Sequence, residues 1–280
     1  MSGGRICLFS WNVNGLRAVM RKGALREFVD RYRPDVLLLQ ETKISEAQIK
    51  ACGVRDEFSE YEQFYSCATK PGYSGTAVWI SKSFRSFSEE AEGRSPVKTG
   101  ASPERSSEDD LKVLLTEGRL TIIELDTFYV VSVYVPNAKD DLSRLAVRGR
   151  WDEHLAEVLA ELQKKKPVVV AGDFNVAHQP IDLARPTANV GKHGYTDEER
   201  VGFSALLERA GMVDSFRHLH PTAVKYSWWS HWGNARANNV GWRIDYFLVS
   251  RELRAKIKSA EIYPEVMGSD HCPVSVELRV

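Results

Sequence analysis

Polar side chains that can bind a metal or move a proton follow short apolar runs at many places along the 280-residue chain. In chain order they are Asn12, Asn14, Glu41, Tyr134, Asn137, Asp173, Asn175, Asp245, Asp270 and His271. A buried core gains nothing from such groups, because a polar side chain loses its hydration there. We therefore expect them to gather in one site, built from the ends of several strands.

Together these residue types are suited to one reaction. Carboxylate oxygens are the ligands that Mg²⁺ prefers, and an Asp with an Asn can hold a water molecule and take its proton. An Asp can also orient a His that stabilises developing negative charge. Taken singly, each residue has an ordinary structural role, such as a turn at Asn14 or a helix start at Glu41. As a set they indicate metal-assisted hydrolysis of a phosphodiester.

The elements that would position these residues are short β-rich runs and two longer helical patterns. Strands are predicted at 6–11, 36–40, 76–81, 120–125, 129–135, 167–171, 244–249 and 273–278. Helices are predicted at 142–162, which has one apolar stripe, and at 196–210, where Thr196 and Glu199 form a capping box and Gly211 ends the helix. With no repeat and no linker, residues 1–280 are expected to form a single α/β domain of two packed sheets with helices outside.

An exposed polar insertion is expected at about 84–117. This stretch is rich in Ser, Glu and Asp, contains Pro96 and Pro103, and holds few large apolar side chains. Such a composition is typical of a solvated surface loop, and a protein-binding role is the alternative.

Composition and charge restrict the class of protein. Hydrophobic residues make up 43% and charged residues 27%, which is typical of a folded globular chain. Lys+Arg and Asp+Glu both number 38, so local patches or a metal must attract any polyanionic partner. The four cysteines, Cys7, Cys52, Cys67 and Cys272, lie far apart, which predicts neither a zinc cluster nor a disulfide framework.

Targeting signals are not evident in the sequence. Residues 1–5 lack an apolar segment, and the longest aliphatic runs, such as 36–39, are far shorter than the roughly 18 residues that span a bilayer. We expect an intracellular protein of the cytoplasm or nucleus, with no membrane partner.

Seven motifs follow one another in the order of a known family. They are SWNVNGLR at 10–17, LQETK at 39–43, GYSG at 72–75, YVPN at 134–137, GDFNVAH at 172–178, NVGWRIDY at 239–246 and GSDHCP at 268–273. The chain resembles the exonuclease III family of apurinic/apyrimidinic (AP) endonucleases from about residue 5 to residue 277. The resemblance implies the endonuclease/exonuclease/phosphatase fold, a four-layered α/β sandwich of two β-sheets flanked by helices.

The resemblance also implies a metal site. Glu41 would be the principal ligand of Mg²⁺, with Asn12 and Asp270 completing or bordering the site, and Mn²⁺ would be a substitute. Whether one or two metals act stays open, because the same carboxylates allow either.

Roles in the reaction follow from the same resemblance. Asp173 would activate the attacking water, which Asn175 would hold. His271, oriented by Asp245, would bond the non-bridging phosphate oxygens. Two further residues, Tyr134 and Asn137, would contact the same phosphate.

Substrate selection is expected to depend on the tryptophan-rich segment 226–246. By resemblance, Trp228, Trp242 and Ile244 would form an apolar pocket for a flipped-out, base-free deoxyribose, whereas Trp229 could equally belong to a packed core. The residues expected to grip DNA phosphates are Arg17, Lys22, Tyr73, Asn189 and Lys192. Asp140 stands where well-known animal members have an arginine that enters the major groove, so that contact is not expected here.

The function that the resemblance implies is a Mg²⁺-dependent AP endonuclease of base-excision repair. It would cut the phosphodiester 5′ to an abasic site and leave 3′-OH and 5′-deoxyribose phosphate ends, with 3′–5′ exonuclease and 3′-phosphodiesterase side activities. Its partner would be double-stranded DNA with abasic sites or 3′-blocked ends, and it would act as a monomer. The alternatives are a phosphoinositide or sphingomyelin phosphatase and a non-catalytic DNA-binding or scaffolding protein.

Overall fold

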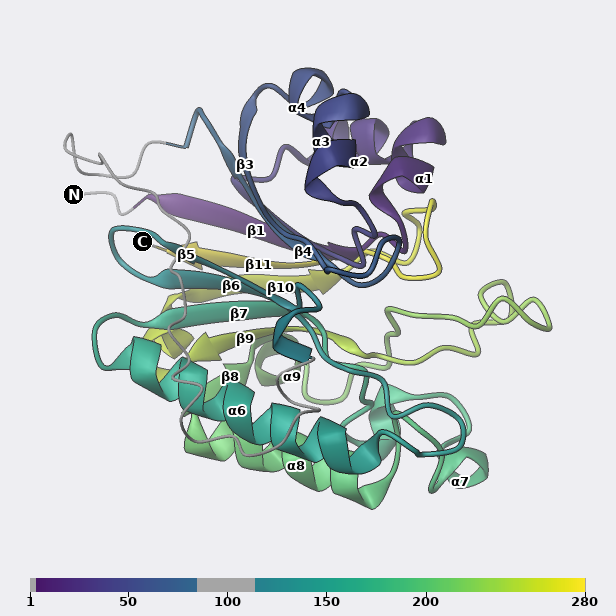
Figure 1. Cartoon of the computed structure of the whole chain (residues 1–280). Helices are drawn as coiled ribbons and strands as arrows, with labels where there is room; N and C mark the ends of the chain where they lie inside the picture. Colours follow the sequence, from purple (N-terminus) through teal and green to yellow (C-terminus); the bar gives the residue numbers. More distant parts are fainter. Residues whose placement is uncertain (1–3, 85–113, 280) are drawn as a thin grey trace.

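The computed structural model describes residues 4–84 and 114–279, and in these residues it has two β-sheets packed face to face (Figure 1). The strand order of the first sheet is β10 (Ile257–Ile262), β11 (Val274–Arg279), β1 (Arg5–Asn12), β2 (Val36–Gln40), β4 (Thr76–Ser81) and β3 (Tyr61–Ser66). The second has the order β5 (Leu120–Glu124), β6 (Tyr129–Tyr134), β7 (Val168–Asp173), β9 (Asp245–Ser250) and β8 (Met212–Asp214). Both sheets are mixed, with parallel pairs β1–β2 and β6–β7.

Helices cover the outer face of each sheet, which gives four layers (Figure 1). The first sheet is covered by α1 (Leu16–Arg21), α2 (Ala24–Tyr32), α3 (Glu46–Ala51) and α4 (Val54–Glu57), and the second by α6 (Leu145–Gln163) and α8 (Asp197–Arg209). The remaining short helices are η2 (Pro180–Asp182), α7 (Pro186–Asn189), α9 (Ser215–Leu219) and η3 (Arg251–Lys256). The predicted four-layered α/β sandwich is confirmed.

The alternation of side chains along the strands explains the layers. In β1, Ile6 and Leu8 enter the core between the sheets, whereas Phe9 and Trp11 pack under the outer helices. In β7, Val169 and Ala171 face the other sheet, whereas Val168 and Val170 face α6 and α8. Each strand is therefore apolar on both faces, as expected for sheets covered on both sides.

The same alternation brings the polar strand ends together. Residues two apart in a strand share a face. Asn12 therefore lies on the same face of β1 as Leu8, and Asp173 on the same face of β7 as Val169 and Ala171, and both faces meet the other sheet. Tyr134 and Asp245 lie on the inner faces of β6 and β9 by the same rule. The four side chains therefore meet between the sheets at one end of the sandwich.

All eight predicted strands are present, with bounds that differ by at most two residues. Three strands were not predicted: β3, β8 and β10. β3 and β10 lie at an edge of the first sheet and carry polar residues such as Glu62 and Lys258, and β8 has only three residues. The capping box at Thr196 is present, and the helix that it begins ends before Gly211.

The expected exposed insertion at 84–117 lies mostly outside the described residues. Its described C-terminal end differs from the expectation, because Leu114 is buried in the core between the second sheet and α6. Glu117 forms an ion pair with Arg119 there. In the two described ranges, no helix combines the length and the apolar character that crossing a bilayer requires.

Candidate active site

A cleft of about 520 Å³ opens at the end of the sandwich where the polar strand ends meet. The predicted site residues that line it are Glu41, Tyr134, Asn137, Asp173, Asn175, Asn189, Lys192, Trp228, Trp242, Ile244, Asp270 and His271. Asn12 and Asp245 are buried directly behind this wall and hydrogen bond to residues that line it. Segments far apart in the chain therefore form one site.

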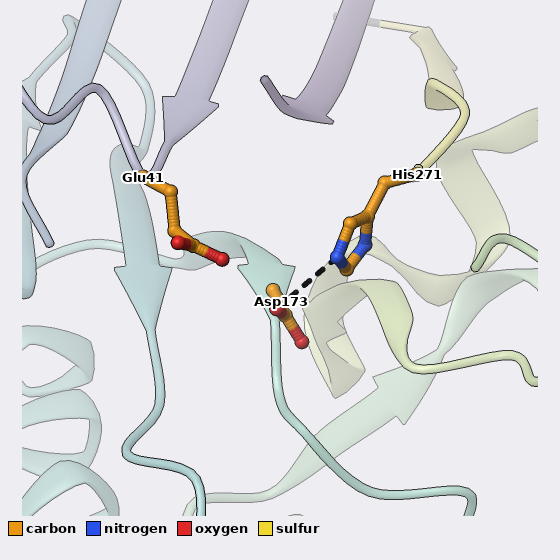
Figure 2. Close-up of side chains that lie close together, drawn as sticks. All are labelled: Glu41, Asp173 and His271. Atoms are coloured by element: carbon orange, nitrogen blue, oxygen red, sulfur yellow. Dashed lines mark ion pairs between the residues drawn. The ribbon is translucent and has the colours of Figure 1, made fainter. Parts of the chain in front are cut away.

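Glu41, Asp173 and His271 form the centre of the cleft, and their side chains point toward one another (Figure 2). Each offers one potential metal-ligand atom, and these atoms all lie within 4.8 Å of one another. Asn12 donates from Nδ2 to Glu41 Oε1 at 3.0 Å and to Asp173 Oδ2 at 2.9 Å. Asn12 Oδ1 accepts from the backbone N–H of Asn14, which fixes the side chain with its Nδ2 toward the cluster. Asn12 therefore borders the cluster and orients its two carboxylates.

Asp245 and Asp173 lie on two sides of the His271 ring. His271 Nδ1 is 2.9 Å from Asp245 Oδ2, and its Nε2 is 3.8 Å from Asp173 Oδ2. Asp245 Oδ2 also accepts from the Ser227 hydroxyl at 2.7 Å, which holds the carboxylate against the ring. This arrangement fixes the imidazole with Nε2 toward the cleft.

Burial and charge shift the pKa values of this group in a way that suits proton transfer. Burial, assisted by the charge of Asp245, raises the pKa of Asp173 to about 7 although His271 opposes the rise. Burial alone would lower the pKa of His271, but the charge and hydrogen bond of Asp245, with Asp173 and Asp270, raise it to about 10. The imidazole is therefore held protonated near neutral pH, next to a carboxyl that titrates there.

Glu41 is held in a tight turn directly after β2. Its φ is 47°, in the left-handed region, which costs a non-glycine residue about 1–3 kcal/mol. The turn is fixed because the Glu41 carbonyl accepts from Gly15 N–H at 2.8 Å and the following N–H of Thr42 donates to Gly75. Lys43 Nζ forms an ion pair with Glu41 Oε2 at 2.9 Å. The carboxylate is thus aimed into the cleft by its backbone.

Asn175 and Asn137 form a pair beside Asp173. The Asn175 backbone N–H donates to Asp173 Oδ1 at 2.8 Å, and Asn137 Nδ2 donates to Asn175 Oδ1 at 3.2 Å. Behind them the buried Arg148 of α6 donates to the carbonyls of Pro136 and Asn175 at 3.3 Å. Arg148 thereby links the two loops that carry the amides, a role that the sequence did not reveal.

Asp270 lies at the cleft but outside the central cluster. Its Oδ1 accepts from Asn14 Nδ2 at 2.9 Å and its Oδ2 from Trp228 Nε1 at 3.1 Å. Burial opposes ionisation, but His271 and these two hydrogen bonds lower the pKa of Asp270. Potential ligand atoms of Glu41, Asp173 and His271 lie within 4.8 Å of one another, and Asp270 stands beside this group, held by Asn14 and Trp228.

Trp228, Trp242 and Ile244 form an apolar wall of the same cleft. Trp228 and Trp242 form an isolated β-bridge, and their rings meet edge to face with centroids 6.3 Å apart. Ile244 packs with Leu183 and Tyr195 in a small cluster that both tryptophans contact. The wall is thus backed by packed side chains and can hold a fixed shape.

The residues predicted to contact phosphate are divided between the cleft and its surroundings. Asn189 and Lys192 line the cleft, whereas Arg17 and Lys22 line separate depressions beside α1. Tyr73 is bound to Arg119 and Arg144 next to Tyr134. Arg17, Lys22 and Tyr73 therefore do not reach the central cluster, and any role for them concerns the flanks of the substrate.

Two neighbouring tryptophans have opposite environments. Trp229 is buried in the core between the sheets, which supports the core alternative. The guanidinium carbon of Arg236 lies over its ring, 4.6 Å from the ring centroid. Trp232 lines the cleft and is 84% exposed, although the sequence did not single it out as a site residue. The signal that was available is the polar stretch around it, Ser230-His231 and Gly233-Asn234, which is typical of a loop.

The donors of the central cluster fit a hard divalent cation. Glu41 and Asp173 supply carboxylate oxygens, and Asn12 holds both in place. Oxygen ligands of this kind suit Mg²⁺ or Mn²⁺, and a nearby imidazole is tolerated better by Mn²⁺. The arrangement can therefore hold a divalent metal ion at the centre of the cleft.

Fold and site together define the class of protein, a four-layered α/β sandwich with carboxylates and one imidazole gathered at one end of its two packed sheets. Residues 9–271 match the model of the endonuclease/exonuclease/phosphatase family, and the chain belongs to that family. It is 42% identical over 282 residues to the exodeoxyribonuclease of Bacillus subtilis, covering 98% of this chain and 99% of that one. It is 39% identical over 274 residues to the DNA-(apurinic or apyrimidinic site) endonuclease of Dictyostelium discoideum, covering 96% of this chain and 69% of that one.

Solved structures agree with this assignment. The AP endonuclease LMAP of Leishmania major superposes with a TM-score of 0.81 at 31% identity, covering 99% of this chain and 88% of that one. The expected resemblance to this family of DNA repair nucleases, and the expectation of an enzyme, are confirmed.

Proposed function

We propose that the protein is a Mg²⁺-dependent AP endonuclease that cuts the phosphodiester 5′ to an abasic site and leaves 3′-OH and 5′-deoxyribose phosphate ends. The observation that carries the proposal is the placement of Glu41, Asp173 and His271 in one cleft with the apolar wall of Trp228, Trp242 and Ile244. The names of the Dictyostelium and Leishmania relatives support the AP-site substrate. The name of the Bacillus relative, exodeoxyribonuclease, supports an exonuclease side activity, to which we assign 3′–5′ direction together with a 3′-phosphodiesterase activity.

The protein's own residues would act as follows. Asp173, whose pKa burial raises to about 7, accepts the proton of the attacking water. Asn175 holds that water beside the carboxylate. His271 donates from Nε2 to the phosphate oxygens, because Asp245 holds its other nitrogen. A Mg²⁺ ion held mainly by Glu41, and bordered by Asn12 and Asp270, would neutralise the negative charge that develops on the phosphate.

Contacts around the reacting phosphate would select the lesion. Tyr134 and Asn137 line the cleft near Asp173 and would bind the same phosphate. The apolar wall would accept a deoxyribose without a base and exclude a nucleotide that still carries one. Trp232, exposed at the rim, offers an aromatic face on which a neighbouring base can stack. Asn189 and Lys192 from the cleft, with Arg17, Lys22 and Tyr73 on its flanks, would hold the DNA backbone.

One chain supplies every residue of this site, so we propose that the protein acts as a monomer on double-stranded DNA. A phosphoinositide or sphingomyelin phosphatase would not need an aromatic wall or an exposed tryptophan at the rim, and a scaffold would not need the aligned carboxylates.

The test uses matched duplexes that hold an abasic analogue, a 3′-blocked nick or no lesion, incubated with Mg²⁺ or with EDTA. We expect incision 5′ to the abasic site with Mg²⁺, weaker release of the 3′ block, and no reaction with EDTA. Asp173→Asn keeps the shape of the side chain but cannot accept the proton, so it should lower the rate by about 10² or more with DNA binding retained. Equal cleavage of the lesion-free duplex, or hydrolysis of phosphoinositide vesicles alone, would refute the proposal.

A further inference from the structure

Arg119 is a buried arginine immediately behind the cleft that no step of the proposed mechanism uses. It precedes β5, and its side chain is 1% exposed. Burial of a guanidinium is costly unless its donors are paired. Arg119 Nε donates to Glu117 at 2.7 Å, Nη1 to the Tyr134 carbonyl at 3.0 Å and Nη2 to the Tyr73 hydroxyl at 2.9 Å. Two of its three partners thus belong to residues of the substrate site.

Tyr134 is held by Arg119 in two ways. The guanidinium lies over the Tyr134 ring, 4.8 Å from its centroid, and such a cation–π contact is strengthened by burial. The backbone bonds are reciprocal, because Tyr134 N–H donates to the Arg119 carbonyl at 2.9 Å while the Arg119 side chain donates to the Tyr134 carbonyl. Ring and backbone of Tyr134 are therefore fixed by one residue.

Tyr73 connects the same arginine to the turn that carries Glu41. The residues that follow Tyr73 are Ser74 and Gly75, and their carbonyls accept from the backbone N–H groups of Lys43 at 2.9 Å and Thr42 at 3.1 Å. Arg119 therefore lies between the phosphate-contacting tyrosine and the turn of the metal ligand.

We propose that Arg119 is a positioning residue that sets where the Tyr134 hydroxyl stands in the cleft and thereby how it meets the reacting phosphate. The proposal rests on the proposed function, because it assigns Arg119 a role through Tyr134. It also has a physical consequence for the free protein, because the guanidinium lies over the Tyr134 ring and bonds its carbonyl whether or not DNA is bound.

The first test is a double-mutant cycle with Arg119→Gln, Tyr134→Phe and the double variant, measured as single-turnover incision of an abasic duplex. Tyr134→Phe keeps the ring and removes the hydroxyl. We expect Arg119→Gln to lower the rate about tenfold with little change in DNA affinity, and to cause less than a twofold further loss in the Tyr134→Phe protein. Multiplicative losses would overturn the proposal, because Arg119 would then act independently of the hydroxyl.

Arg55→Gln is the control for loss of a cation–π contact. Arg55 of α4 is exposed, lies over the Tyr65 ring at 5.6 Å from its centroid and donates to the carbonyl of Gln63, and neither Tyr65 nor Gln63 lines the cleft. Its loss should leave incision unchanged. Arg119→Lys keeps the positive charge but lacks the planar guanidinium, so its incision rate should lie between those of the wild-type protein and Arg119→Gln. If Arg119→Gln fails to fold, as judged by its melting transition, Arg119→Lys replaces it in the same cycle.

A second readout does not require activity and separates failure of this proposal from failure of the proposed function. The protein is labelled with 3-fluorotyrosine, and the Tyr134 resonance is identified as the one lost in Tyr134→Phe. In the DNA-free protein, Arg119→Gln should shift this ¹⁹F resonance, whereas Arg55→Gln should not. If Arg119→Gln shifts the resonance but the wild-type protein does not incise abasic DNA, the proposed function alone would be refuted. An unmoved resonance would refute the role of Arg119.

Discussion

Asp173 and Asp245 are direct partners in the antiparallel register of β7 and β9, and both lie on the face that meets the other sheet. Two carboxylates in such a position repel each other, and the His271 ring bonded to Asp245 places a positive charge beside both. The two strands thus place two carboxylates beside the His271 ring, and the proposed mechanism uses Asp173 as the base and Asp245 as the carboxylate that orients the imidazole.

This relationship predicts the pH dependence of the reaction. The rate should rise as Asp173 loses its proton, near or below pH 7 because a bound cation lowers its pKa further, and should fall as His271 loses its proton near pH 10. Asp245→Asn removes the charge that raises the pKa of His271, so the descending limb should move to lower pH. Single-turnover rates across pH for both proteins measure this shift.

Asp35→Asn is the control for that profile. Asp35 is a part-buried carboxyl that accepts from the backbone N–H of Cys7, next to the start of β2, far along the strand from Glu41. Its replacement should not move either limb. A descending limb that stays in place in Asp245→Asn would show that Asp245 does not control the charge of His271.

Removal of the Glu41 charge should weaken metal binding. Glu41→Gln keeps the turn but loses a charged oxygen, so we expect Mg²⁺ and Mn²⁺ affinity to fall by tenfold or more, on the order of 1.4 kcal/mol. Calorimetric titration and the rise of the melting temperature with metal both measure this without substrate. Asp270→Asn should cost less, because Asp270 is already engaged by Asn14 and Trp228. The reverse order would assign the principal ligand to Asp270.

Trp242 should control the choice of lesion. Trp242→Ala enlarges the apolar wall, so the ratio of incision rates on abasic and intact duplexes should fall, while the salt dependence of binding stays nearly constant because no phosphate contact is lost. Trp232→Ala is the comparison. It removes an exposed rim ring and should weaken binding of both duplexes alike. Equal losses on both duplexes for Trp242→Ala would mean that Trp242 supports the fold only.

Gly172 should not tolerate a side chain. It precedes Asp173, has φ 152°, and a Cβ there would lie 1.9 Å from the Val133 carbonyl oxygen. Gly172→Ala should therefore lower the free energy of unfolding by several kcal/mol, or displace β7 and reduce incision. Gly149→Ala, in α6 with nothing within 4 Å, should instead stabilise the protein by about 0.5–1 kcal/mol. Denaturant unfolding of both variants tests the contrast, and a Gly172→Ala protein of normal stability would contradict it.

The amino-acid sequence determined the local elements of this protein. Apolar runs of strand length fix the eight predicted strands, and the Thr196 capping box fixes the start of α8, because both depend on neighbours within a few residues. The position of the polar residues at strand ends, together with the ordered motifs, also determined the family and the set of candidate site residues.

Tertiary structure decided which of these residues are partners. Asn12 reaches Asp173 across the two sheets, although 161 positions separate them, and Glu41 is brought close to Asp173 and His271. It also decided that Trp229 is core and Trp232 is surface, and that Arg119 stands behind Tyr134. Such pairings depend on strand order and on the packing of one sheet against the other. Local propensity carries no information about either, because the contacts form between segments that are distant in the chain.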